Sequence, residues 1–109
     1  MTRKLNEKEM VLIKHLLHIA KDDRVSIKLP ELIEVMQDGE MGSIQFGSRN
    51  GRSFGKDIVQ VKYVDQDSIP VFITLIEDNH GALFELEFWK VNFSKLIEFP
   101  SPTQVEVLK

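Results

Sequence analysis

The residues best suited to chemistry lie first in a short glycine-containing segment, Asp38–Ser43, which reads Asp-Gly-Glu-Met-Gly-Ser. Its backbone amides, two carboxylates and one hydroxyl could contact a ligand, through the candidate residues Asp38, Glu40 and Ser43. A tight turn between strands explains the same residue types, since Asp-Gly is a strong turn dipeptide and glycine tolerates positive φ angles. We therefore expect a turn here, with ligand binding as the alternative.

A second segment, residues 47–57, carries three cations among glycines: Arg49, Arg52 and Lys56. Such groups can bind a phosphate or an acidic partner through charge-assisted hydrogen bonds. The segment lacks the spacing and the strand–loop–helix setting of a P-loop. We expect the longest loop of the chain here, with solvated cations. Nucleic-acid binding, with Phe54 stacking on a base, ranks below protein and small-ligand binding.

Glu85, Glu87 and Trp89 alternate with apolar residues and should therefore share one face of a strand. Two carboxylates could act as acid and base on a glycoside, but that chemistry needs a deep cleft. Charge pairing with Lys62 on a neighbouring strand is a simpler explanation. Trp89 is the only tryptophan, and interfaces favour an aromatic anchor within a polar rim. We favour a protein-binding patch on this face.

Two histidines, His15 and His18, share a side of a predicted helix, with Asp22 one turn further on. A metal pair of this kind lacks a third clear ligand, and His80 falls in a turn. The chain has no cysteine, which excludes disulfides, thiolate catalysis and zinc sites built on sulfur. We expect no metal, no cofactor and no catalytic residue.

The composition describes one ordinary globular domain over residues 1–109, 42% hydrophobic and 28% charged. The net charge of -3 argues against a dedicated nucleic-acid binder. No apolar run approaches the roughly 18 residues that span a bilayer, and the N-terminus does not read as a secretory signal. We expect a cytoplasmic protein without membrane contact, whose partner is another protein rather than a nucleic acid.

The candidate groups must be positioned by one helix and several strands. Asn6 and Glu9 form a capping-box pattern at the start of a helix predicted over Glu7–Lys21. Its apolar residues recur at helical spacing: Met10, Ile13, Leu16, Leu17 and Ala20. Residues 25–36 fit a helix or a strand, and the turn that follows favours a strand over Leu32–Gln37.

Further strands are expected where apolar residues alternate with polar ones or run together: Ser43–Phe46, Ile58–Val64, Pro70–Ile76 and Phe84–Trp89. Residues 70–76 are apolar on both sides and predict a central strand covered on both faces. A tethering segment should then run to Phe99 and anchor the C-terminal part by aromatic burial. Residues 101–109 are expected to form an edge strand or a flexible tail, and an edge strand could support a homodimer.

The connections are too short for crossover helices, so the strands should pair antiparallel. The expected fold class is α+β: an antiparallel meander of about five strands with one N-terminal amphipathic helix packed on one face. We expect one core shared by helix and sheet, which includes Ile13, Leu17, Phe84 and Phe88.

Three stretches resemble a family of small bacterial domains of unknown function: Leu5–Leu17, the Asp38–Ser43 turn, and residues 84–100 with Trp89, Lys90, Phe93, Ser94 and Leu96. The resemblance covers nearly the whole chain and implies a shared fold without a particular chemistry. The turn at Asp65–Ser68 departs from the Asp-x-Asp-Gly expected there, so no ligand is inferred for it.

Domains of this appearance sometimes lie beside bacterial toxin and immunity genes. The resemblance therefore implies a protein-binding module, with an immunity-type inhibitor as one form of it. The alternative is a small-ligand domain or an enzyme that uses the Asp38–Ser43 turn together with residues 49–56.

Overall fold

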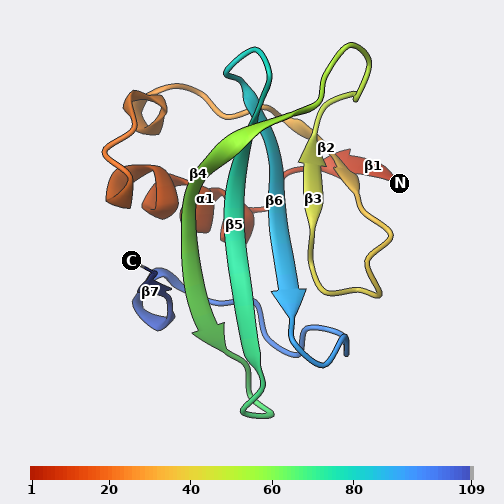
Figure 1. Cartoon of the computed structure of the whole chain (residues 1–109), viewed down its shortest axis with the longest axis vertical. Coiled ribbons are helices and arrows are strands. Elements are labelled where there is room, and N and C mark those ends of the chain that lie inside the picture. The colour runs from red at the N-terminus through yellow and green to blue at the C-terminus, as the bar shows by residue number, and fades with distance from the viewer. Residues whose placement is uncertain (109) are drawn as a thin grey trace.

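A computed structural model describes residues 1–108 and shows an α-helix packed against one face of a seven-stranded antiparallel sheet (Figure 1). The elements are β1 (Thr2–Lys4), α1 (Glu7–Ile19), β2 (Leu32–Val35), β3 (Ile44–Phe46), β4 (Phe54–Val64), β5 (Pro70–Asp78), β6 (Leu83–Lys90) and β7 (Glu106–Val107). Two short 3-10 turns, Asp23–Ser26 and Pro102–Gln104, lie in the connections. No helix within this range has the length and apolar character needed to cross a membrane.

The helix begins at the predicted capping box. The Glu9 amide donates to the Asn6 side chain at 2.8 Å, and the Glu9 carboxylate accepts from the Asn6 amide at 3.0 Å. That carboxylate is buried and also accepts two hydrogen bonds from Arg3, each 2.8 Å long. The helix ends at Ile19, earlier than predicted, because Lys21 has a φ of 54°, which an α-helix cannot contain.

The core lies between α1 and the inner face of the sheet, as predicted. Leu12, Ile13, Leu16 and Leu17 of the helix are fully buried against alternating residues of β4, β5 and β6: Val61, Tyr63, Val71, Ile73, Leu75, Leu86 and Phe88. The prediction for Phe84 was wrong, because it is buried outside this cluster. The ladder between β5 and β6 skips Phe84, pairing Glu85 with Ile76 and Leu83 with Glu77, so Leu83 enters the core instead.

The strand order is β1-β2-β3-β6-β5-β4-β7, which corrects the predicted meander of about five strands. Strands β4, β5 and β6 do follow one another, but β3 pairs with β6 across the sheet instead of with β4. The two additional strands, β1 and β7, lie at the edges and have only three and two residues. An edge strand was one of the two alternatives predicted for residues 101–109, but β1 was not predicted, because three residues are too few to show an alternating pattern.

The predicted loop over residues 47–57 ends early, because β4 already begins at Phe54. Irregularities in the ladder to β5 fall at Gly55 and Ile58. A Cβ atom on Gly55 would lie 2.1 Å from the carbonyl oxygen of Asp78, so only glycine allows the two strands to approach there. Glycine and charged residues had suggested a loop, but at this position the glycine belongs to a bulged strand.

The helix covers one face of the central strand β5. On the other face Thr74 and Ile76 are also buried, but Phe72 is partly exposed, so the expectation of cover on both sides is confirmed only in part. Figure 1 looks onto the opposite face, with α1 behind the sheet. We call the side of β4, β5 and β6 that points away from α1 the open face. Its residues in register include Lys62, Phe72 and Trp89 in one row and Gln60, Thr74 and Glu87 in the next.

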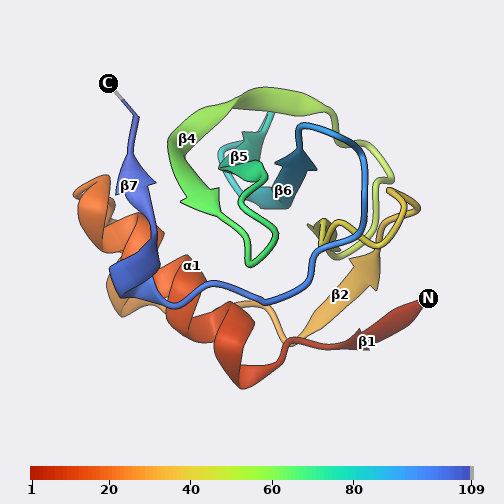
Figure 2. The ribbon, with the colours of Figure 1, turned by 90° about the horizontal axis from the view of Figure 1, so that it is seen from below.

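Residues 91–105 form the predicted tether. They run from the end of β6 along the rim of the curled sheet and past α1 to β7 (Figure 2). Leu96, Phe99 and Val105 pack against the core, and Phe99 contacts the ring of Phe88 with centroids 5.4 Å apart. Within the C-terminal end predicted as an edge strand or a flexible tail, residues 106 and 107 form β7 and pair with β4, and residue 109 lies outside the described residues.

Candidate functional site

The predicted turn at Asp38–Ser43 connects β2 to β3, and its polar groups are used within the fold. The Asp38 carboxylate accepts the amides of Met41 at 3.1 Å and Ser43 at 2.9 Å. The buried Ser43 hydroxyl accepts a hydrogen bond from the Phe88 amide at 2.9 Å and donates one to the Phe88 carbonyl at 3.3 Å. It thus binds the backbone groups of β6 that a neighbouring strand would otherwise bind. Glu40 is exposed, with a φ of 62°. This geometry explains Asp38 and Ser43 without a ligand.

Arg52 is the most connected side chain of the predicted basic loop. Its guanidinium lies 2.6 Å from the buried carboxylate of Asp78 and donates to the carbonyl oxygens of Phe46, Ser48 and Leu83. The hydrogen bond from Arg52, followed by those from the amides of residues 82 and 80, lowers the pKa of Asp78 to about 2. Arg52 therefore holds the β3–β4 connection against the β5–β6 turn, instead of facing solvent as expected.

Arg49 forms an ion pair with Glu85 and, like Arg52, lies over the ring of Phe84 with its guanidinium carbon 4.9 Å from the centroid. Phe84, which lies outside the core cluster, is thus covered by two cations, an arrangement that cation–π attraction favours. Lys56 lies elsewhere, on the rim of a small hollow with Asp22, Asp57 and Glu77. The three predicted cations therefore do not form one binding site.

The open face carries the predicted Trp89, whose surface is 46% exposed. Its ring packs on Phe72 of β5, with centroids 5.7 Å apart. Lys62 lies on the far side of Phe72, so it cannot pair with Glu85 or Glu87 as we had expected. The neighbour of Glu87 across the ladder is instead Thr74.

A hollow of about 390 Å³ lies beside Trp89, between β6 and the β2–β3 connection, and is lined by Met36, Gln37, Asp38, Met41, Ser43, Glu87, Phe88 and Trp89. The fold thus brings together four of the nine predicted residues: Asp38, Ser43, Glu87 and Trp89. Burial raises the pKa of Glu87, and the negative charges of Glu85 and Asp57 raise it further. Sequence reasoning missed Met36 and Phe72, which only the strand pairing places beside Trp89.

A buried ionic cluster on the core side of β6 was not predicted. The Lys90 ammonium, fully buried, lies 2.9 Å from Asp65 and 2.8 Å from Asp67, and donates to the Lys95 carbonyl at 3.1 Å. Burial by itself would raise the pKa of Asp65, but hydrogen bonds from the Ile97 amide and from Lys90 lower it to about 2. These contacts fasten the tether to the β4–β5 turn and leave no free group for chemistry.

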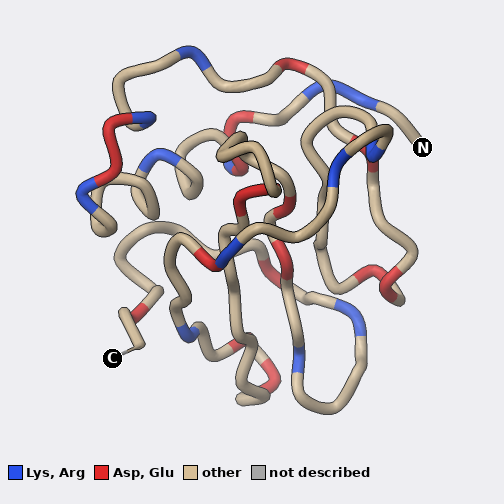
Figure 3. The backbone as a smooth tube through the Cα atoms, turned by 45° about the horizontal axis from the view of Figure 1, so that its top comes forward, with Lys and Arg blue, Asp and Glu red and all other residues tan. Residues whose placement is uncertain are grey.

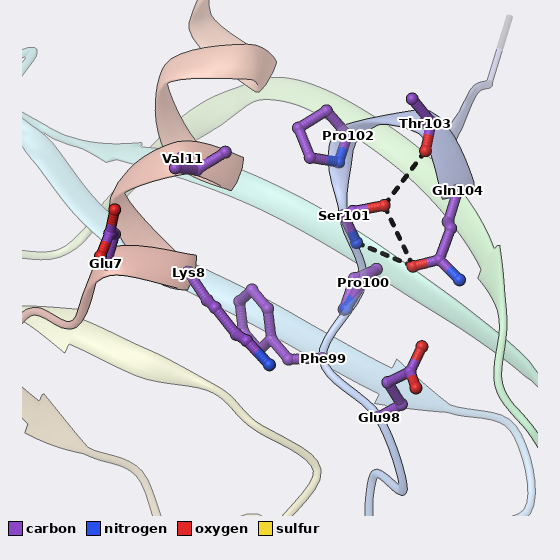
Figure 4. Close-up of a pocket in the computed structure, with 10 residues that line it drawn as sticks. All are labelled: Glu7, Lys8, Val11, Glu98, Phe99, Pro100, Ser101, Pro102, Thr103 and Gln104. Carbon is purple, nitrogen blue, oxygen red and sulfur yellow. Dashed lines mark hydrogen bonds between the residues drawn. The ribbon is translucent and has the colours of Figure 1, made fainter.

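A larger hollow, about 770 Å³, separates the first turns of α1 from residues 98–104 (Figure 4). Val11, Pro100 and Pro102 lie on its walls. Some of its polar groups bind one another: the Gln104 side chain accepts from the Ser101 amide at 2.9 Å. None of the predicted site residues lines this hollow.

The histidines His15 and His18 lie one turn apart on α1, close in sequence to Asp22. The Asp22 carboxylate, their conceivable partner, is bound by Arg24 at 2.6 Å. Across residues 1–108, no group of three or more His, Cys, Asp or Glu side chains could hold a metal ion.

Comparison with known proteins gives a family but no function. Residues 2–100 match the family described as "Domain of unknown function (DUF6984)". No curated protein and no solved structure matches the chain. The chain belongs to this family of domains of unknown function, which agrees with the resemblance seen in its motifs.

Proposed function

We propose that this domain is a small protein-binding module of the bacterial cytoplasm, and that it binds its partner through the open face around Trp89. The observation that carries the proposal is a tryptophan that is 46% exposed on a sheet face without a covering element in the described chain. The ring of Phe72 on the neighbouring strand packs beside the indole, so little side-chain entropy is lost when a partner contacts it.

The surroundings of Trp89 have the composition of an interface. Phe72 is half-buried beside it, and Val64 and Val91, both exposed, flank Pro70 at the same end of the sheet. Single exposed apolar residues are common on protein surfaces, but a group of them around an aromatic anchor is typical of binding sites. Polar residues border the group, as in the rim of an interface.

The alternative, a small-ligand domain or an enzyme, has less support. It required the Asp38–Ser43 turn and the basic loop to share one pocket. Arg52 instead lines a different hollow from Asp38 and Ser43, and its guanidinium is used in structural hydrogen bonds. The Asp38–Ser43 turn and Arg52 of the basic loop both use their polar groups in hydrogen bonds within the fold. No observation favours this second function.

Within the binding proposal, we favour an immunity-type inhibitor, which blocks a toxic enzyme by covering part of its surface. The support is the small, rigid sheet face, which can be buried against a partner at low entropic cost. A test is co-expression with the captured partner, where the wild-type domain should restore growth and a domain with a disrupted open face should not.

The binding proposal is tested by affinity purification from the native host with the wild-type chain, Trp89→Ser and a matched control, Val11→Ser. Val11 is 47% exposed, nearly the same as Trp89, but lies on α1 on the opposite side of the sheet. We expect one specific protein to be retained by the wild type and by Val11→Ser and lost with Trp89→Ser. Recovery of no specific protein, or equal recovery with all three, would contradict the proposal.

A further inference from the structure

We propose that the partner of the open face is a basic protein, and that one of its arginine or lysine side chains enters the hollow beside Trp89. This inference rests on the proposed function and adds the chemistry of the partner. It follows from the charge of the hollow, from the groups that face it and from the apolar patch next to it.

The hollow carries two carboxylates, Asp38 and Glu87, and none of its lining residues is a cation. The positions of acidic and basic residues along the chain are shown in Figure 3. Glu85 lies two residues before Glu87 on the same face of β6 and is neutralised by Arg49, whereas Asp57 lies on β4, two strands away, in the row of Glu85. Lys62, the cation in the row of Trp89, is separated from the hollow by Phe72. The hollow therefore carries negative charge without a neutralising cation in its lining.

The two carboxylates differ in how they are held. Asp38 is fixed by the amides of Met41 and Ser43, so its position is set before any partner binds. Glu87 has neither a hydrogen bond nor an ion pair with any residue that the structure describes, and its charge is disfavoured by burial and by its acidic neighbours. A cation placed beside Glu87 would relieve this repulsion.

The remaining walls fit the stem and the head of a basic side chain. Met36 and Met41 offer apolar, adaptable contact to methylene groups. The exposed indole of Trp89 offers an aromatic face to a guanidinium or ammonium group. Because the apolar patch with Phe72 and Val64 continues beyond the hollow, the occupant is a protein surface with a basic side chain at its edge, not a free small cation.

The inference can be tested without the natural partner, because Trp89 is the only tryptophan and its fluorescence reports on this hollow alone. The probes are two synthetic peptides that alternate leucine with arginine or leucine with glutamate. We expect the arginine peptide to change the emission of the full chain saturably, with an affinity that falls as salt is added. The glutamate peptide should bind at least tenfold more weakly.

The variant Glu87→Gln should weaken binding of the arginine peptide about fivefold, the usual range for a partly exposed ion pair. The control Glu31→Gln makes the same change of charge at an exposed carboxylate that lines a hollow beside α1, and should leave the affinity within about twofold. Equal binding of the two peptides, or unchanged binding to Glu87→Gln, would overturn the inference.

The two proposals can fail separately. A captured partner that depends on Trp89, combined with peptides that bind alike, would retain the binding module and refute the basic partner. Selective binding of the arginine peptide without any captured protein would support the chemistry of the hollow and contradict the module.

Discussion

Trp89 and Lys90 are adjacent on β6, yet their exposures are the reverse of what their side chains usually show. Trp89 is 46% exposed on the open face, whereas Lys90 is completely buried on the core side. Lysine is almost never fully buried unless it is paired, and tryptophan is highly buried on average. The comparison shows that the core side of β6, with Lys90, finds its partners within the chain, whereas the open face, with Trp89, does not.

Lys90 is buried because its ammonium has three acceptors: the carboxylates of Asp65 and Asp67 and the carbonyl of Lys95. Trp89 has Phe72 on one side of its ring and a shallow hollow on the other. The buried Lys90 is therefore explained by contacts within the fold, whereas the exposed ring of Trp89 is not, and it is the basis of the proposed binding site.

The largest expected effect is the loss of the buried cluster. Asp65→Ala leaves Lys90 charged and buried and removes the acceptor of the Ile97 and Glu98 amides. Removing one member of a buried ion pair typically costs about 3–5 kcal/mol, so the free energy of unfolding should fall by that amount. Urea unfolding followed by fluorescence measures it. Asp67→Asn serves as the control and should cost less, because the Asp67 side chain is one-third exposed.

Acid should weaken the same cluster. The folded-state pKa of Asp65, about 2, lies below the ordinary value of 3.8, so its contribution to stability is present above about pH 4 and is lost as the pH falls toward 2. The stability difference between the wild type and Asp65→Asn should therefore shrink between pH 4 and pH 2. A difference that stays constant over this range would show that Asp65 is not charged in the folded protein.

Loss of the exposed ring should affect stability much less. Trp89→Ser removes the packing on Phe72, and aromatic pairs of this kind contribute about 0.5–1.5 kcal/mol. Thermal unfolding followed by circular dichroism should therefore show a small decrease, while binding of the partner is lost. If Trp89→Ser proved as destabilising as Asp65→Ala, the contrast between the two sides of β6 would be refuted and Trp89 would be a structural residue.

The smallest effect is expected for Glu87→Gln. The raised pKa of Glu87 means that the fold disfavours its charge, so removal of the charge should stabilise the protein slightly. Glu87 is only partly desolvated and remains exposed to solvent, so screening keeps the change within about 0.5 kcal/mol. Thermal unfolding at neutral pH should show it, and the gain should disappear in acid, where Glu87 is protonated in the wild type. A destabilised variant would reveal a structural contact of Glu87.

Interactions between residues near in sequence could be predicted. The capping box joins Asn6 to Glu9, three residues apart, and helical spacing identified the buried face of α1. The turn at Asp38–Ser43 was predicted from its residue types, and alternation identified the buried residues of β4, among them Val61 and Tyr63. These features depend on backbone preferences and on the period of the side chains, both of which are local.

Contacts between distant residues could not be predicted. Arg49 and Arg52 looked like free cations until the fold placed Glu85 and Asp78 beside them. The bulge that removes Phe84 from the core depends on the register between β5 and β6, and alternation along one strand does not contain that register. The partner proposed for Trp89 likewise depends on the fold, which places Asp38 of the β2–β3 connection and Glu87 of β6 in the lining of one hollow.

The sequence by itself determined the class of the domain, its helix and its central strands, because burial of an apolar stripe and the chemistry of turns act over a few residues. Only the tertiary structure decided that Lys90 is enclosed and Trp89 open, that β3 pairs with β6, and that two carboxylates share a hollow with an indole. The physical reason is that an ion pair, a strand register or a binding surface is made by groups that the chain brings together from far apart, and its energy depends on their burial and on their partners.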